Sequence, residues 1–235
     1  MMAANNKPHS YFAPGAPTVV KAGGVKNLDL PILNLSTNES SFGASPLVLE
    51  AIQDRADNPH RYPDPSSTEL REAIGKSFDL DPALITCGNG SEEVIDGVAR
   101  VYARPGDEIL FCEYGFLQFP IVAYRVGATP VKAPASNLKT DVDNLLSAVT
   151  DKTKIVFVAN PDNPTGTYIS SSEMRRLRDG LPPHIVLVVD SAYCEYVDDP
   201  DFTDGMELVE GHDNVIVTRT FSKAWGLAGL RVGWG

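Results

Sequence analysis

Polar side chains that could bind and transform a small molecule come directly after three apolar strips of this sequence. The strips are residues 155–159 (IVFVA), 185–189 (IVLVV) and 215–218 (VIVT). Their continuous apolar character is typical of strands that are covered on both faces of a parallel sheet. Ligands of such sheets bind beyond the carboxyl ends of the strands, so we expect the polar groups that follow to converge there. These groups are Asn163, Asp190, Tyr193, Thr220, Ser222, Lys223 and Arg231.

Three of these residues offer complementary chemistry. Lys223 lies among apolar residues at a strand end, where burial and a neighbouring cation would lower its pKa and make the amine nucleophilic toward an aldehyde. Asp190 ends a buried strand, where a carboxylate is costly unless it is paired, for example with a protonated ring nitrogen of a bound heterocycle. Arg231, with the hydroxyls of Thr220 and Ser222, could hold a phosphate dianion.

Each of these features also has a purely structural interpretation, which the sequence leaves open. A single lysine or arginine is commonly a solvated surface charge or part of an ordinary ion pair. The run 160–166 (NPDNPTG) could be only a turn. The run 87–93 (CGNGSEE) predicts a Gly-rich turn that opens a helix, where backbone N–H groups favour a phosphate, but the same residues fit a plain strand–helix turn. The convergence of several polar groups, rather than any one of them, favours a binding site.

Composition describes an acidic globular protein. The chain has 235 residues, 43% of them hydrophobic, and a formal net charge of −11, which makes nucleic acid and anionic membranes poor default partners. Its three cysteines form no CxxC pair, which argues against zinc ribbon and thioredoxin motifs and favours a reducing compartment. The first residues show no apolar core of signal-peptide length, and no apolar run is long enough to span a membrane. We therefore expect a cytoplasmic protein without a bound metal, a nucleic-acid partner or a membrane partner.

Helix signals alternate with the apolar strips. Strands are predicted at the three strips above and at residues 108–112 (EILFC). Strands that alternate with helices indicate an α/β fold with a doubly wound, mostly parallel sheet. Residues 1–30, which are rich in Asn, Gly, Pro and Ala, predict an extended arm. Helices are predicted to begin at Ser45 and Pro46, at Ser66 with Glu69 in capping-box spacing, at Ser91, and at Ser170 with Glu173 in the same spacing.

Taken together, the motifs resemble those of fold-type I pyridoxal 5′-phosphate (PLP) enzymes of the class I and II aminotransferases, and among these the histidinol-phosphate aminotransferases. The resemblance implies a three-layer PLP-transferase fold with a mostly parallel central sheet. Residues 1–44 would be an N-terminal arm and small-domain segment, and residues 45–235 the PLP-binding large domain, with most of the small domain missing. The matching phrases are 38–39 (NE), 61–63 (RYP), 88–93 (GNGSEE), 105–108 (PGDE), 160–166 (NPDNPTG), Asp190 with Tyr193, and 220–233 (TFSKAWGLAGLRVG).

The resemblance also implies a role for each matching residue. Lys223 would be the catalytic residue, which bonds the aldehyde of PLP and later moves a proton. Asp190 would pair with the ring nitrogen, and Asn163 and Tyr193 would hydrogen-bond the oxygen on the ring. Asn38 would lie near the substrate. The other implied cofactor contacts are Phe116 stacking on the ring, Tyr62 reaching the phosphate from the other subunit of a homodimer, and Ser91, Glu92, Thr220, Ser222 and Arg231 at the phosphate.

The implied reaction transfers the amino group of L-histidinol phosphate to 2-oxoglutarate, a step of histidine biosynthesis. An aromatic aminotransferase, a threonine-phosphate decarboxylase and a non-catalytic fragment that binds a phosphorylated ligand remain alternatives. The sequence departs from the family pattern at 38–41, which reads NESS instead of NENP. Residues 112–116 (CEYGF) lack the usual proline and threonine, so Tyr114 is an alternative to Phe116 as the stacking aromatic. The family continues beyond residue 235, so we expect a truncated sequence without the family's substrate-binding arginine.

Overall fold

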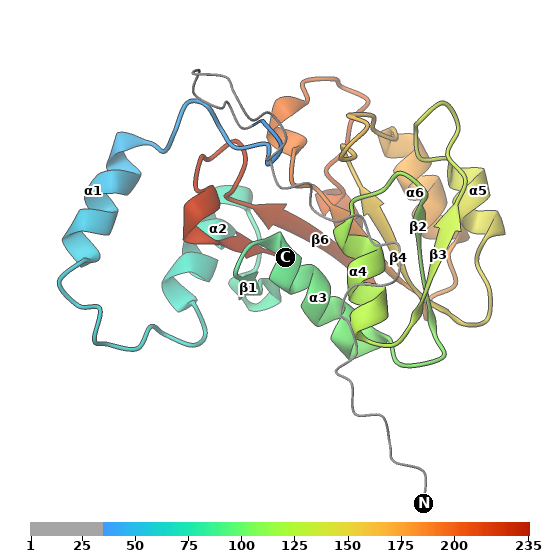
Figure 1. Cartoon of the computed structure of the whole chain (residues 1–235), viewed down its shortest axis with the longest axis horizontal. Helices are drawn as coiled ribbons and strands as arrows, with labels where there is room; N and C mark the ends of the chain where they lie inside the picture. Colours follow the sequence, from blue (N-terminus) through green and yellow to red (C-terminus); the bar gives the residue numbers. More distant parts are fainter. Residues whose placement is uncertain (1–34) are drawn as a thin grey trace, which may run out of the picture.

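The computed structural model describes residues 35–235, which form a central sheet with helices on both faces (Figure 1). The arm predicted for residues 1–30, and most of the predicted N-terminal segment 1–44, lie outside the described residues. Within the described part of the chain, no helix is long and apolar enough to cross a membrane.

A mostly parallel sheet forms the centre of the molecule, in the strand order β1-β7-β6-β5-β4-β2-β3. Neighbouring strands from β6 to β3 are parallel, whereas β7 is antiparallel to both β6 and β1. The predicted α/β fold is therefore confirmed, with a short antiparallel edge added to it. The strands are β1 (Cys87–Gly88), β2 (Glu108–Cys112), β3 (Thr129–Ala133), β4 (Thr153–Ala159), β5 (Val186–Asp190), β6 (Val215–Thr220) and β7 (Gly233–Trp234).

Alternate residues of the central strands point into two separate hydrophobic clusters. In β4, Phe157 packs on the side of α3 and α4, and Val158 packs on the side of α5 and α6. Both faces of the sheet are thus buried, which explains why the sequence shows continuous apolar strips rather than alternation. The helices are α3 (Ser91–Tyr102), α4 (Gln118–Arg125), α5 (Val142–Ser147) and α6 (Ser171–Gly180).

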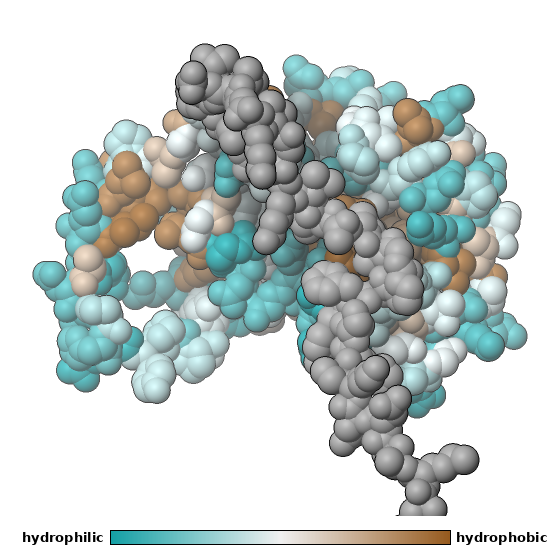
Figure 2. All heavy atoms as spheres, viewed as in Figure 1, coloured by the Kyte–Doolittle hydropathy of each residue, from teal (hydrophilic) through white to brown (hydrophobic). Residues whose placement is uncertain are grey.

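Two further helices, α1 (Pro46–Arg55) and α2 (Thr68–Phe78), lie beyond the β1 edge of the sheet (Figure 1). Helix α1 starts at the predicted proline but has no buried residue. Its hydrophobic side chains, among them Leu47 and Ile52, are exposed, and Figure 2 shows hydrophobic residues gathered on α1 at the left of the view. Helix α1 therefore presents an apolar surface that this chain does not cover within the described residues.

The four predicted strands are all present, with ends shifted by up to two residues. Strand β2 matches its prediction, β4 begins earlier, β5 is displaced by one residue, and β6 continues to Thr220. Strands β1, β3 and β7 were not predicted. Strands β1 and β7 are only two residues long, and β3 (TPVKA) is a partly exposed edge strand, so none of them carries an apolar strip.

Helix caps agree with the sequence in one place and differ in two others. Ser170 accepts a hydrogen bond from the Glu173 N–H at 3.3 Å, as the capping-box spacing predicts. The box predicted at Ser66 is wrong, because the carboxylate of Asp64 accepts the N–H groups of Ser66 at 3.0 Å and of Thr68 at 2.8 Å. Helix α3 does begin at its predicted serine, but the residue in the capping position is the glycine before it.

Candidate active site

The carboxyl ends of β4, β5 and β6 bring predicted polar residues to one edge of the sheet. Asp190 is the last residue of β5 and lies opposite Ala159 of β4 and Thr218 of β6. It lies on the same face of β5 as Val188, which packs on the α3 and α4 side. The hydroxyl of Thr218 donates a hydrogen bond to Asp190 Oδ1 at 2.8 Å. The carboxylate is therefore held in one orientation at the end of the buried sheet.

Asp190 is a buried carboxylate whose charge is only partly compensated. It is 4% exposed. Burial raises its pKa from 3.8 to about 6, while the hydrogen bond from Thr218 opposes that rise. The charges of Glu92 and Asp162 raise the pKa further, and the amine of Lys223 lowers it. A cationic group bound beside Asp190 would supply the missing positive charge.

Lys223 follows β6, and its amine lies close enough to Asp190 and Arg231 for their charges to affect its pKa. Its Nζ donates to the backbone carbonyl of Thr37 at 3.0 Å and lies 5.6 Å from the centre of the Tyr193 ring. Burial lowers the pKa of the amine below its ordinary value, and the Arg231 guanidinium adds to this effect. A lowered pKa increases the neutral, nucleophilic fraction of the amine near pH 7.

Tyr193 joins two other predicted residues that are distant in the sequence. It directly precedes the 3₁₀ turn η2 (Cys194–Tyr196). Its phenol oxygen accepts hydrogen bonds from the side-chain amides of Asn38, at 3.0 Å, and Asn163, at 3.4 Å. The segment before α1, the loop after β4 and the turn after β5 thus meet at one oxygen atom.

Polar groups gather around Arg231 at the start of α3. The guanidinium donates to Ser222 Oγ at 3.1 Å and to the backbone carbonyl of Asn89 at 3.2 Å. It also lies 3.9 Å from the carboxylate of Glu92, in the first turn of α3. The hydroxyl of Thr220 in turn donates to Ser222 Oγ at 3.0 Å. Arg231, Ser222 and Thr220 are therefore linked side by side next to the N-terminus of a helix.

Two glycines allow this close approach between Arg231 and α3. A Cβ at Gly90 would collide with the Arg231 guanidinium, and a Cβ at Gly233 would collide with the backbone of Gly90 and Ser91. Gly90 also has φ of +85°, in the left-handed region that favours glycine. The first N–H groups of α3 therefore start next to a cation, an arrangement that suits a phosphate or another anion.

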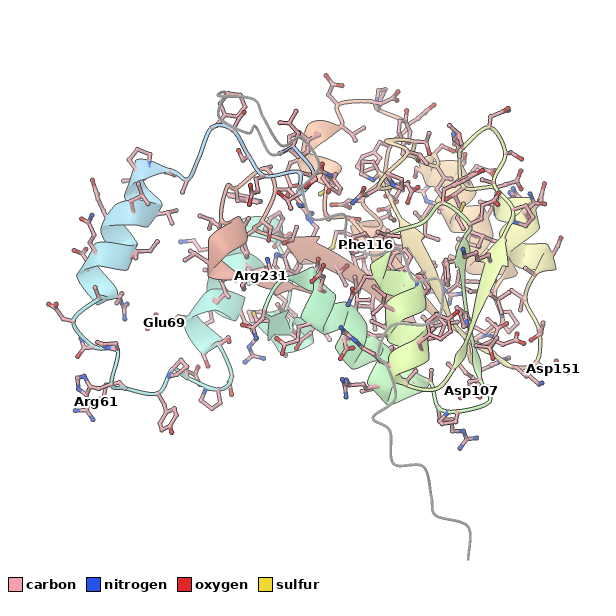
Figure 3. All side chains as sticks on the ribbon, in the orientation of Figure 1. Arg61, Glu69, Asp107, Phe116, Asp151 and Arg231 are labelled. Atoms are coloured by element: carbon pink, nitrogen blue, oxygen red, sulfur yellow. The ribbon has the colours of Figure 1, made fainter. Side chains whose placement is uncertain are left out.

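The predicted aromatic contacts differ in their placement. Phe116 is partly buried on the Asp190 side of the sheet, with its ring edge-on to Phe119 at 5.8 Å between centres. Tyr114, the alternative, is 44% exposed. Tyr62 is fully exposed in the loop after α1. Figure 3 shows its neighbour Arg61 at the edge of the molecule, far from Arg231 and Phe116, so Tyr62 does not join the site within its own chain.

Two residues of this site, Thr218 and Asp162, are not predicted by the sequence motifs. Thr218 holds Asp190, and the available signal was a polar residue at the end of an apolar strip. Asp162 is buried in the loop after β4, where the hydroxyl of Thr165 donates to it at 3.0 Å. Burial raises the pKa of Asp162 to about 6. Its place in a run of turn-forming residues concealed this burial.

A match to a protein family supports the chemistry that the site geometry suggests. The model of aminotransferase class I and II matches residues 31–235, which is most of the sequence. The chain belongs to the class I and II aminotransferase family. The family membership expected from the motifs is therefore confirmed, and the site described above lies within the matched part of this aminotransferase chain.

Two curated relatives of this aminotransferase chain give a more specific comparison. It is 54% identical over 203 residues to the histidinol-phosphate aminotransferase of Rhodospirillum centenum, covering 86% of this chain and 56% of that protein. It is 51% identical over 215 residues to that of Ruegeria pomeroyi, covering 91% of this chain and 59% of that protein. The chain thus spans little more than half the length of these curated relatives.

A solved structure supports the same fold. The crystal structure of histidinol-phosphate aminotransferase from Sinorhizobium meliloti in complex with pyridoxal-5′-phosphate matches with a TM-score of 0.80 at 34% identity. The match covers 84% of this aminotransferase chain and 54% of that chain. The predicted PLP-transferase architecture is therefore confirmed for the part of the fold that the chain contains.

Proposed function

We propose that this chain forms the cofactor-binding part of a PLP-dependent aminotransferase that transfers the amino group of L-histidinol phosphate to 2-oxoglutarate. The observation that carries the proposal is the meeting of Asp190, Lys223 and Arg231 at one edge of the sheet. Folding alone gains nothing from a buried carboxylate with a raised pKa near an amine with a lowered pKa, and such pairs concentrate at functional sites. The choice of substrate rests on the similarity to the Rhodospirillum centenum enzyme.

The residues present fit PLP. Asp190 offers a negative charge for the protonated ring nitrogen, and Arg231 with the start of α3 offers donors for the phosphate dianion. Lys223 offers an amine for the aldehyde. When bound, PLP supplies an electrophilic carbon and a protonated ring that accepts electrons as a bond at the substrate α-carbon breaks. Residues 45–235 would then be the cofactor-binding domain.

Lys223 has two tasks in this proposal. Its amine would hold PLP at the aldehyde carbon, and with a substrate bound the Nζ would accept the proton from the substrate α-carbon. Both tasks need an unprotonated amine, which the lowered pKa of Lys223 favours. Asp190 would keep the ring nitrogen protonated. Asn163 and Tyr193 would orient the ring through its oxygen, and Phe116 would stack on the ring.

The phosphate would be held by charge and by hydrogen bonds together. Arg231 supplies the cation, and Ser222 and Thr220 supply hydroxyl donors beside it. The backbone N–H groups of Ser91 and Glu92 are in the first turn of α3, where the partial positive charge of a helix end adds to the attraction. A phosphate held in this way would position the aldehyde for the amine of Lys223.

We also propose a homodimer in which Tyr62 reaches the phosphate site of the other subunit. Tyr62 is fully exposed in its own chain, and the hydrophobic side chains of α1 are exposed with it, so this end of the molecule offers a surface to a second copy. Asn38, hydrogen-bonded to Tyr193, would lie beside the substrate. Sedimentation that finds only monomer in the presence of PLP would contradict the dimer.

The cytoplasmic location stays a prediction from the cysteine pattern.

The test uses the protein encoded by the complete gene, purified and supplied with PLP. We expect glutamate to form from histidinol phosphate and 2-oxoglutarate. We also expect an absorption band in the visible to near-ultraviolet range, and borohydride should attach the absorbing cofactor permanently to Lys223. Phenylalanine and threonine phosphate serve as comparison substrates. Faster conversion of either one would assign another reaction to the same site. A soluble protein without any band after addition of PLP would contradict the cofactor assignment itself.

A further inference from the structure

The opposite side of β6 carries a cluster of charged and aromatic residues that the proposed reaction does not use. Neighbouring residues of a strand point to opposite faces, so Arg219 points away from Thr218 and Thr220. Its guanidinium is buried and lies 2.8 Å from the carboxylates of both Glu195 and Asp204. It also packs over the ring of Trp234, 5.9 Å from the ring centre. Arg219 is therefore held from several directions.

Glu195 links this cluster to the candidate active site. Its Oε1 accepts a hydrogen bond from Arg219 Nη2 at 2.8 Å and another from the indole N–H of Trp225 at 3.2 Å. Glu195 comes two residues after Tyr193, and Trp225 comes two residues after Lys223. One carboxylate oxygen therefore connects the turn that carries the tyrosine to the loop that carries the lysine.

These two hydrogen bonds matter because packing alone does not fix Glu195. A cavity of about 520 Å³ lies beside the cluster and is lined by Glu195, Arg219, Cys194 and Glu207, among others. A side chain that borders open space keeps its position through its hydrogen bonds rather than through close packing. Trp225 is itself 47% exposed, with its ring edge-on to Phe221 at 5.8 Å between centres.

We infer that Glu195 is a positioning residue that sets the placement of Lys223 relative to Tyr193. The Nζ of Lys223 lies 5.6 Å from the centre of the Tyr193 ring, and the Glu195–Trp225 hydrogen bond links the two segments that carry these residues. Arg219 holds Glu195 in turn, as the buried anchor of the arrangement. The catalytic consequence rests on the proposed function, because it assumes that Lys223 is the reacting amine.

The first test needs no cofactor. Acetylation of Lys223 in the PLP-free protein of the complete gene, followed by peptide mass spectrometry across a pH series, gives the pH midpoint of its reactivity. Trp225→Phe keeps an aromatic ring but removes the N–H donor. We expect this variant and Glu195→Ala to loosen the loop, hydrate the amine and move the midpoint upward, toward an ordinary lysine. Glu195→Gln keeps an oxygen that can accept the indole N–H, so it should restore most of the wild-type midpoint.

The matched control is Glu207→Ala. Glu207 lines the same cavity, but its carboxylate accepts from Thr203 and lies 3.9 Å from Arg175, neither of which is in the Lys223 loop. It should leave the midpoint of Lys223 unchanged. A wild-type midpoint in Trp225→Phe would overturn the inference. So would a shift in Glu207→Ala as large as that in Glu195→Ala, because the effect would then be general loosening.

The second test uses the protein of the complete gene with PLP. We expect Trp225→Phe to lower kcat about three- to tenfold with little change in KM, because the reacting amine is misplaced while substrate contacts remain. An unchanged kcat would refute the catalytic consequence. A wild-type protein that does not bind PLP would contradict the proposed function but would leave the acetylation result valid, so the two failures can be told apart.

Discussion

The two faces of the sheet differ in how charged residues are compensated at the carboxyl ends of β5 and β6. On one face, Asp190 receives a hydrogen bond from Thr218 but keeps a raised pKa, and nearby Lys223 has a lowered pKa. On the other face, Arg219 is paired with Glu195 and Asp204, and these partners raise the pKa of its guanidinium against the effect of burial. Charges are left partly uncompensated on the first face, whereas the guanidinium on the second face is paired with two carboxylates.

This difference shows how one edge of a sheet can serve chemistry on one face and stability on the other. A site that binds a charged cofactor needs charged groups that interact favourably with it. In the cofactor-free protein these groups are uncompensated and lower the free energy of unfolding. The paired cluster behind them offsets this cost by fixing the backbone. Mutations on the first face should therefore change activity strongly with little loss of stability. Loss of Arg219 on the second face should mainly lower stability, and loss of the Glu195–Trp225 hydrogen bond should have the smaller effect on kcat proposed above.

Lys223→Ala gives the largest expected effect and acts on the first face. We expect the amino-transfer rate of the complete protein to fall at least about a thousandfold, because no other amine takes the place of Nζ. Bound PLP should be partly retained through the donors around Arg231, and the free energy of unfolding should hardly change. Turnover assays, PLP content after gel filtration and urea unfolding measure the three quantities. Near-normal turnover would show that Lys223 is not the reacting amine.

Arg219→Gln tests the second face. We expect it to lower the free energy of unfolding by about 3–5 kcal/mol, because two carboxylates lose a buried counter-charge. Urea unfolding of the PLP-free protein measures this change. A loss similar to that of an exposed ion pair would mean that the cluster does not stabilise the fold, and the contrast between the two faces would fail.

Asp190→Asn should stabilise the PLP-free protein. The native pKa of about 6 exceeds the ordinary 3.8, so the native state binds more protons than the unfolded state between these values. Stability therefore falls as the pH rises through this window, and the cost is complete above about pH 6. Removing the charge should raise the free energy of unfolding at about pH 7.5 by about 1–3 kcal/mol. The gain should shrink toward zero as the pH falls to about 4. A gain that does not depend on pH would point to packing instead.

Arg176→Gln gives the smallest expected effect and calibrates the other measurements. Arg176 of α6 forms exposed ion pairs with Glu173 of the same helix and with Asp143 of α5. We expect its loss to lower the free energy of unfolding by less than about 1 kcal/mol, with less effect at high salt, because solvent screens exposed pairs. Urea unfolding at two salt concentrations measures this. A loss as large as that of Arg219→Gln would remove burial as the explanation of the difference.

The strands were predictable because burial on both faces of a sheet requires continuous apolar residues. Strands β2, β4, β5 and β6 carry such strips, and Asp190 and Lys223 were found by looking just past them. Strands β1 and β7 could not be found this way, because two residues carry no pattern. The prediction of a helix cap at Ser66 was wrong because a competing acceptor, Asp64, lies just ahead of α2.

The sequence by itself determined the α/β class, the family and the residue types that follow each strand, because periodicity and motifs are local properties of the chain. Only the tertiary structure brought Asn38 to Tyr193, 155 residues away, and placed Glu195 between Arg219 and Trp225. It also decided that Asp190 would be buried with a raised pKa. These features depend on the order of strands in the sheet and on which face each side chain takes, and no local stretch of sequence encodes either.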